Sequence, residues 1–283
     1  MSRVDLHLHS TVSDGKFSPA EIVGKAAEHG LTIIAITDHD SVDGVVPALE
    51  VAKSFPGMNV ISGVEISTDV PQGEIHVLGY FVNCTDSEFL AALQRFRQSR
   101  LRRAQQMVAK LRNFGILIEW GRVQELAGCS SIGRPHIAQV MLEDGYISSF
   151  KEAFAKYISR GGPAYVEREK MTPGEAAELI LRTNGLPVLA HPLTINNLET
   201  VVVELKAAGL VGIEVYYNGY TDDEIKRLVS LANKYDLITT GGSDYHGLDD
   251  TTETMIGGAN VPIESAERLI ALAEKRVLKL ANQ

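Results

Sequence analysis

The sequence predicts an α/β fold with seven strands, one fewer than in a TIM barrel. Short apolar runs alternate with helical segments along most of the chain. Two helix starts carry a hydroxyl, a proline and a glutamate in capping-box order, at residues 18–21 and 172–175. The 283 residues, 45% of them hydrophobic, are enough for the core of one large domain or of a domain with an insertion.

The first part of the chain alternates regularly between strand and helix. We expect strands at residues 4–9, 33–37 and 59–67, and helices from Ser18 to His29 and from about 42 to 54. The next strand, 74–82, follows after six residues, too few for a parallel crossover. The two strands therefore form a hairpin in which Glu65 can face His76.

A long helix, from about 86 to 113, leads into a stretch without strand rhythm. We expect a mostly helical inserted subdomain at 96–166, and a barrel domain formed by 1–95 and 167–283. After the insertion the alternation resumes. The expected strands are 187–190, 211–216 and 237–241, the helices between them 198–208 and 221–235, and a closing helix starts at 263.

Composition excludes several classes of protein. The net charge of −9 argues against binding to long duplex nucleic acid, because such affinity depends on Lys and Arg. No run approaches the ~18 apolar residues of a membrane span, and the N-terminus enters a polar strand, so we expect a cytoplasmic protein. The two cysteines, Cys84 and Cys129, lack the spacing of a thiolate metal site or a disulfide framework.

Histidines gather at one edge of the predicted barrel. Five lie at or just after the C-terminal end of a strand, where barrel enzymes place catalytic groups: His7, His9, His39, His191 and His246. His76 reaches that edge through the hairpin. One such histidine is more often structural than metal-binding, but six at one edge, accompanied by Asp14, Glu65 and Asp244, predict a metal centre. Imidazole and carboxylate together favour Zn, Mn or Fe.

Other polar residues near this edge have simpler explanations. Asp5, Asp38 and Asp40 are expected to support ligands or cap loops rather than to bind metal. His29 lies in the last turn of a helix, where an imidazole interacts favourably with the helix end. Glu214, Tyr216 and Tyr217 follow the sixth strand and are expected to support the site or to pack.

The ordered motifs of the chain resemble those of the polymerase and histidinol phosphatase (PHP) family. They span almost the whole sequence: His7-Leu8-His9-Ser10, Thr37-Asp38-His39-Asp40, Gly63-Val64-Glu65-Ile66, Ala190-His191-Pro192 and Gly242-Ser243-Asp244-Tyr245-His246. The resemblance implies a distorted seven-stranded barrel and a metal-dependent phosphoesterase with two or three divalent ions, Mn, Fe or Zn.

The resemblance also assigns ligands to each metal. His7, His9, Glu65 and Asp244 would hold one ion, Glu65, His76 and His191 a second, and Asp14, His39 and His246 a third. Many family members have a histidine where this chain has Asp14. We count Asp244, His191 and His246 as catalytic residues. A metal-bridging hydroxide would attack the phosphorus, and His191 or His246 would protonate the leaving group, with the choice between them open.

Substrate contacts are expected mainly from the insertion. Ser131, Arg134 and His136 lie in a short loop that leads into a helix, and this motif is similar to that of the branch that removes the 3′-phosphate of nucleoside 3′,5′-bisphosphates. Related members trim short RNA from its 5′ end. Arg160 and, after the sixth strand, Asn218 would also contact the substrate. Alternatively, Ser131 caps the helix and Arg134 forms a surface ion pair.

Two other functions remain open at this point. The chain could be a phosphatase for small metabolites of the histidinol phosphate type, although the insertion argues against it. It could also be a non-catalytic module that metal ions stabilise, although its ligand set is nearly complete. The expected partner is a small phosphorylated substrate, a nucleotide or short RNA, and the oligomeric state is left open.

Overall fold

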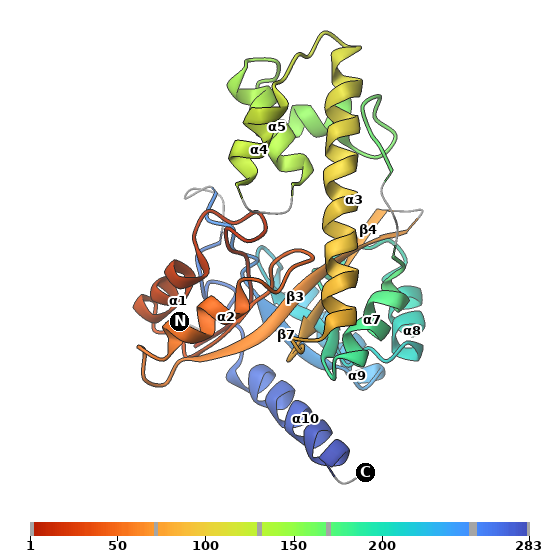
Figure 1. Cartoon of the computed structure of the whole chain (residues 1–283). Coiled ribbons are helices and arrows are strands. Elements are labelled where there is room, and N and C mark those ends of the chain that lie inside the picture. The colour runs from red at the N-terminus through yellow and green to blue at the C-terminus, as the bar shows by residue number, and fades with distance from the viewer. Residues whose placement is uncertain (1–2, 71–72, 129–131, 168–170, 249–253, 282–283) are drawn as a thin grey trace. The chain divides into compact units, whose positions relative to one another are not determined.

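The computed structural model describes residues 3–70, 73–128, 132–167, 171–248 and 254–281 (Figure 1). The chain divides into two compact units. One, the barrel unit, contains residues 1–90 and 171–283, and the other, the helical unit, contains residues 91–170. Each is described by itself.

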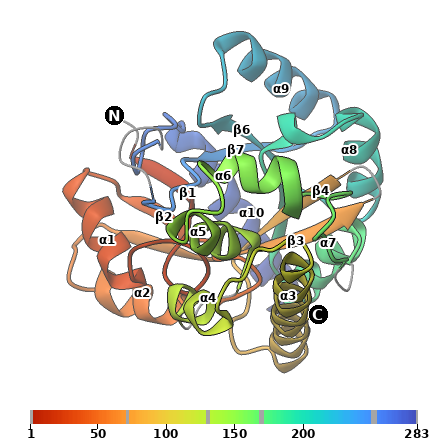
Figure 2. The ribbon, with the colours of Figure 1, turned by 90° about the horizontal axis from the view of Figure 1, so that it is seen from above.

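Seven strands follow one another in chain order around the barrel unit (Figure 2). They are β1 Val4–Leu8, β2 Ile33–Ile36, β3 Asn59–Val70, β4 Gly73–Tyr80, β5 Leu186–Leu189, β6 Gly212–Tyr217 and β7 Ile238–Gly242. Neighbours pair in parallel, except that β4 is antiparallel to both β3 and β5. Beyond the last strand, the backbone N–H of His9 donates to the carbonyl of Tyr245 over 3.0 Å. The sheet is therefore a nearly closed barrel, as predicted.

The strand that carries Glu65 is longer than the sequence predicted. β3 pairs with β2 up to Ser62 and then, from Gly63 to Val70, with β4. Glu65 therefore lies inside the strand rather than at its end, because the hairpin continues the strand beyond the parallel sheet. Ser67 pairs directly with His76, so Glu65 and His76 are diagonal neighbours on one face, and the predicted hairpin is confirmed.

Helices cover the outside of the barrel and one of its ends. α1 and α2 lie beside β1 to β3, and α7 to α9 lie around β4 to β7 (Figure 2). Their bounds are α1 Pro19–Glu28, α2 Val45–Ala52, α7 Pro173–Arg182, α8 Leu198–Ala207 and α9 Asp222–Lys234. Both predicted capping boxes form, at Ser18 and at Thr172. The last helix, α10 Ile263–Ala281, packs Ala266 and Leu269 into the barrel core near Val4, at the end where β1 begins.

The helical unit has a hydrophobic core of its own. It contains most of α3 Ser87–Arg112, and then α4 Trp120–Ala127, α5 Arg134–Glu143, α6 Phe150–Ala153 and one π-helical turn, Phe154–Ile158. Met107, Leu111, Ile137, Met141 and Ile158 belong to this core and are buried. Its apolar side chains therefore pack mainly against one another.

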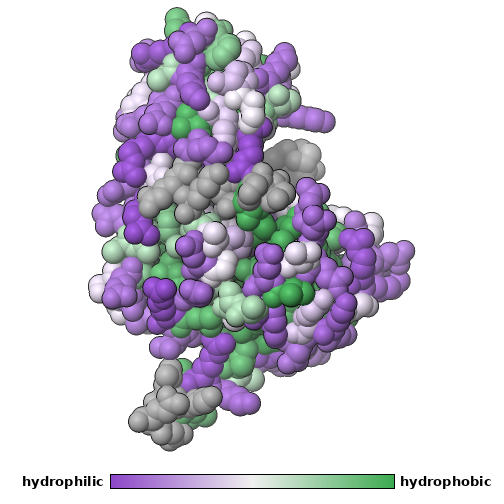
Figure 3. Space-filling view, turned by 90° about the vertical axis from the view of Figure 1, so that its right-hand side faces the viewer, coloured by the Kyte–Doolittle hydropathy of each residue, from purple (hydrophilic) through white to green (hydrophobic). Residues whose placement is uncertain are grey.

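The face in Figure 3 is mainly hydrophilic, with hydrophobic side chains in small patches between the polar ones. Such scattered apolar residues are normal on protein surfaces. Among the described residues, no helix combines the length and the apolar character that crossing a membrane requires.

Candidate metal centre

The structure brings the nine predicted metal-binding residues into one cluster within the barrel unit. Three overlapping groups have ligand atoms within 4.8 Å of one another: His7, His9, Glu65 and Asp244; His39, Glu65 and His76; and His9, Asp14, His39 and His246. His191 joins the cluster through contacts to Glu65 and His76. Most of these residues lie at strand ends, and β3 and β4 add Glu65 and His76 from their hairpin.

Glu65 is at the centre, and its two oxygens face different sets of imidazoles. Oε1 lies 2.7 Å from Nδ1 of His76 and 3.0 Å from Nε2 of His191. Oε2 lies 3.0 Å from Nδ1 of His39, 3.2 Å from Nε2 of His9 and 3.4 Å from Nε2 of His7. A carboxylate in this position can bridge two cations, which is the role that the resemblance implied.

Asp244 faces the same centre from the loop after β7. Its Oδ1 lies 3.0 Å from Nε2 of His9 and 3.3 Å from Nε2 of His7. Its Oδ2 accepts a hydrogen bond of 2.6 Å from the hydroxyl of Tyr217. Oδ2 is thus fixed by Tyr217, and Oδ1 is directed at His7 and His9.

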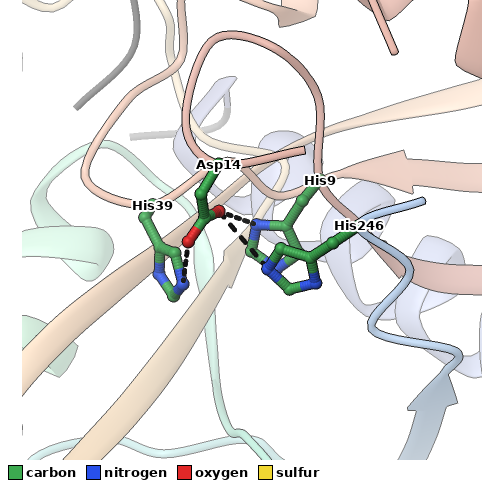
Figure 4. A group of neighbouring side chains, drawn as sticks. All are labelled: His9, Asp14, His39 and His246. Carbon is green, nitrogen blue, oxygen red and sulfur yellow. Dashed lines mark ion pairs between the residues drawn. The ribbon is translucent and has the colours of Figure 1, made fainter. Parts of the chain in front are cut away.

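Asp14, in the loop after β1, points at three imidazoles (Figure 4). Its Oδ1 lies 3.3 Å from Nε2 of His246 and 3.7 Å from Nδ1 of His9, and its Oδ2 lies 3.7 Å from Nε2 of His39. Many family members have a histidine in place of Asp14. The aspartate side chain is shorter than a histidine, but it still reaches the centre of this group. Its geometry is compatible with a third cation.

The backbone adopts uncommon conformations around the centre. Asp40, His191 and Asp244 have φ angles of 50°, 25° and 54°, a region that side chains other than glycine rarely adopt. Gly242 makes a close approach possible, because a Cβ at this position would lie 2.3 Å from Cβ of His7. The absence of a side chain there lets β7 pass directly beside β1.

Three aspartates support the loops, as expected from the sequence. Asp5 accepts hydrogen bonds from the backbone of Ser243, from its hydroxyl and from the backbone of Gly257. Asp38 accepts from Ser10 and Ser13, and Asp40 accepts from the backbone N–H of Ser67. These bonds tie the loops after different strands to one another.

Two residues of β6 have a more specific place than the sequence predicted. Glu214 contacts Nδ1 of His7 and the backbone N–H of His191, and Tyr217 donates to Asp244. Residues three apart in a regular strand face opposite sides. Here β6 has a bulge between Glu214 and Tyr216, which re-aims Tyr217 toward the side of Glu214. The alternation of the sequence gives no sign of this bulge.

The charges of the cluster shift the pKa values of its members. Burial alone would lower the pKa of His9, but the carboxylates of Asp244 and Glu65 outweigh it and raise the pKa to about 10. Burial lowers the pKa of His39 to about 3, against the attraction of Glu65 and Asp14. For Glu65 and Asp14 the neighbouring histidines outweigh burial and hold both carboxyl pKa values well below the usual range.

The unsatisfied atoms of the cluster fit metal ions. Nε2 of His7, Nε2 of His9, Oδ1 of Asp14 and Oε2 of Glu65 are buried and have no hydrogen-bond partner within the described ranges. Buried polar atoms without partners are costly. Oε2 of Glu65 faces Nε2 of His7 and of His9, and Oδ1 of Asp14 faces the neighbouring group of His9 and His246. Cations among them would satisfy all four, and nitrogen with carboxylate oxygen is the donor set that Zn, Mn and Fe accept.

The predicted substrate residues belong to both units. In the helical unit, Nδ1 of His136 accepts a hydrogen bond of 3.0 Å from the backbone of Gly133 and thereby caps α5. The guanidinium of Arg134 lies 5.5 Å from the ring centroid of Phe154, and Arg160 lies 3.7 Å from Glu167. Asn218 is half-buried in the turn after β6 of the barrel unit. Ser131, with its predicted cap or substrate contact, lies outside the described residues.

Several known proteins are similar to this chain. The 5′-3′ exoribonuclease of Haemophilus influenzae is 34% identical over 86% of this chain and 90% of its own. The 3′,5′-nucleoside bisphosphate phosphatase of Chromobacterium violaceum is 30% identical over 87% and 88%. A crystal structure from Bifidobacterium adolescentis, described as a proposed metal-dependent phosphoesterase, superposes with a TM-score of 0.84 at 27% identity and covers 95% of both chains.

A further crystal structure agrees with these similarities. An amidohydrolase from Chromobacterium violaceum, with bound sulfate and no metal, also superposes with a TM-score of 0.84, at 28% identity over 97% of both chains. The sequence profile of the PHP domain matches residues 5–167, more than half of this chain. The family that the motifs indicated is therefore confirmed, and this chain belongs to the PHP domain family.

Proposed function

We propose that this chain removes the 3′-phosphate of nucleoside 3′,5′-bisphosphates and also accepts short 5′-phosphorylated RNA, with two or three divalent ions, Mn, Fe or Zn. Phosphoester hydrolysis itself, the predicted class of activity, is confirmed by the family and its relatives. The observation that carries the proposal is the position of Glu65, whose two oxygens face two sets of imidazoles.

The chain's own residues would prepare the reaction. The nine clustered side chains would hold the cations, which supply an activated water and neutralise charge on the phosphoryl oxygens. Nε2 of His246 lies at Asp14, and Nε2 of His191 lies at Glu65, so each is held at the edge of the cluster. Whichever of these two imidazoles leaves a ring nitrogen uncoordinated can give a proton from that nitrogen to the leaving alkoxide.

The names of the relatives support nucleotide and RNA substrates. Three of them are 5′-3′ exoribonucleases and one is a 3′,5′-nucleoside bisphosphate phosphatase, while another relative, from Eggerthella lenta, is a phosphoribosyl 1,2-cyclic phosphate 1,2-diphosphodiesterase. A histidinol phosphate activity has no support among these names. A purely structural module is disfavoured because all nine ligand residues lie together.

The insertion at 96–166 is proposed to bind the substrate. Arg134, His136 and Arg160 would contact phosphate groups, Ser131 would add a hydroxyl, and Asn218 of the barrel unit would contribute its amide. A net charge of −9 fits a short ligand better than a long duplex. We place the protein in the cytoplasm, in keeping with such substrates.

The test compares three substrates on the purified protein, with and without Mn²⁺. Phosphate release is measured from adenosine 3′,5′-bisphosphate, from histidinol phosphate and from a 5′-phosphorylated oligoribonucleotide. The proposal expects Mn²⁺-dependent activity on the bisphosphate and on the RNA. Activity on histidinol phosphate alone would replace the substrate class, and an inactive protein that still binds Mn²⁺ would favour the structural module.

A further inference from the structure

The carboxylate of Glu214 contacts one residue from each of the two sets of imidazoles that meet at Glu65. Its Oε1 lies 3.0 Å from Nδ1 of His7, and its Oε2 accepts a hydrogen bond of 2.7 Å from the backbone N–H of His191. Glu214 and His7 are both 0% exposed. Water therefore cannot replace either contact without a rearrangement of the barrel.

The contact with His7 decides which ring nitrogen can bind a metal. A neutral imidazole carries one N–H, and a carboxylate beside Nδ1 places that hydrogen on Nδ1. The lone pair of Nε2 then faces Glu65 and Asp244, at 3.4 Å and 3.3 Å. Glu214 thus holds His7 in the tautomer and orientation that a metal at this position requires.

The contact with His191 holds its backbone. His191 has φ 25° and ψ 61°, a conformation that residues other than glycine rarely adopt and that persists where surrounding contacts impose it. The hydrogen bond from its N–H to Glu214 is one such contact. In this conformation, Nε2 of His191 lies 3.0 Å from Oε1 of Glu65 and 3.2 Å from Nδ1 of His76.

We propose that Glu214 is a positioning residue that couples the two metal positions sharing Glu65. An ion beside His7 orders that imidazole, which fixes Glu214, and Glu214 then holds His191 ready for the second ion. The two ions bind with positive cooperativity as a result. This inference rests on the proposed function, because it needs the metals that the function requires.

The substitution Glu214→Gln tests the coupling with little change in volume. A glutamine side chain has one acceptor oxygen and one donor amide, so it cannot accept from both His7 and His191. The backbone N–H of His191 can only donate, and so the oxygen turns toward it and the amide faces His7. Nδ1 of His7 must then accept, which moves the hydrogen to Nε2 and blocks the metal position.

The measurement is a titration of the metal-free protein with Mn²⁺, followed by elemental analysis of the bound metal. For Glu214→Gln we expect an affinity about 10–100-fold weaker and a loss of cooperativity between the first two ions. The control is Asp223→Asn, whose carboxylate is 93% exposed on α9, the helix that follows the same strand. It should bind Mn²⁺ like the unchanged protein.

The outcomes separate this inference from the proposed function. An unchanged protein that binds no divalent ion would refute the function. If it binds two ions and Glu214→Gln binds both with the same affinity and cooperativity, the coupling role is wrong. Should Glu214→Gln fail to fold, as circular dichroism would show, nitrogen NMR of the Zn²⁺-loaded unchanged protein still decides. A hydrogen on Nδ1 of His7 supports the role, and one on Nε2 overturns it.

Discussion

The metal cluster of the barrel unit and the predicted substrate residues of the helical unit differ in how their polar atoms are satisfied. In the barrel, buried atoms of His7, His9, Asp14 and Glu65 lack hydrogen-bond partners within the described part of the chain. In the helical unit, by contrast, His136 caps α5 and Arg160 pairs with Glu167. The cluster is thus arranged for a ligand that the protein itself does not supply, whereas the predicted substrate residues already have contacts that binding would have to share.

The largest expected effect is that of Glu65→Ala, which removes the shared carboxylate. Both sets of imidazoles lose their common anion, so at least one metal should be lost. Activity should fall on the order of 1,000-fold or more, since metal catalysis is worth several kcal/mol. Phosphate release and elemental analysis measure the two effects. Glu178→Ala, at an exposed carboxylate of α7, is the matched control; full metal content in Glu65→Ala would contradict the bridging role.

A smaller effect is expected for Tyr217→Phe. The substitution removes the 2.6 Å hydrogen bond to Asp244 but keeps the ring. Hydrogen bonds to charged groups contribute about 1.5–3 kcal/mol, so metal affinity or kcat should fall roughly 10–100-fold. Titration with Mn²⁺ and steady-state kinetics distinguish the two. The control Tyr146→Phe, in the helical unit, should change neither, and an unaltered Tyr217→Phe enzyme would show that Asp244 holds its position without the phenol.

The sequence predicted the residues that meet in the metal cluster of the barrel unit well, and the reason is physical. Parallel strands of a barrel end at one edge, so motifs as far apart in the chain as those of His7 and His191 were expected to meet there. The length of β3 escaped prediction, because pairing with β4 extends it beyond the apolar run. The specific contacts of Glu214 and Tyr217 also escaped it, and that of Tyr217 depends on a bulge in β6 that the sequence pattern does not reveal.

The roles of the polar residues in the helical unit were harder to predict. The hydroxyls, the glycine and the basic side chains of the motif at residues 130–136 suggested phosphate contacts, but they did not reveal that His136 caps the helix through Nδ1. A loop of polar residues serves capping and ligand binding equally well, and the sequence holds no period that distinguishes the two. The substrate roles of Arg134, His136 and Arg160 therefore remain predictions.

The substitution Arg134→Ala tests whether the helical unit contributes to substrate binding. If Arg134 contacts the substrate phosphate, its loss should raise KM roughly 10-fold, as for one charge-assisted hydrogen bond, and leave the bound metal unchanged. Kinetics with adenosine 3′,5′-bisphosphate measure the effect. Arg182→Ala, on an exposed turn of α7, serves as the control. Identical KM values in both variants would show that Arg134 does not contact the substrate.

A further prediction concerns the stability of the metal-free protein. The folded-state pKa of His9 is raised to about 10, above the unfolded value of about 6.5. Its stabilising contribution is therefore complete below pH 6.5 and is lost as the pH rises toward 10. The Tm should fall over this range, by roughly 2–4 °C for each kcal/mol lost. Thermal melts with and without Zn²⁺ test this, because bound metal replaces the protons and should reverse the trend.

The most direct test of the metal centre is anomalous X-ray diffraction from crystals of the Mn²⁺-loaded protein. Our account predicts at least two peaks beside Glu65, one among His7, His9 and Asp244 and one among His76 and His191. A crystal that contains Mn²⁺ elsewhere but shows no peak within coordination distance of Glu65 would contradict it.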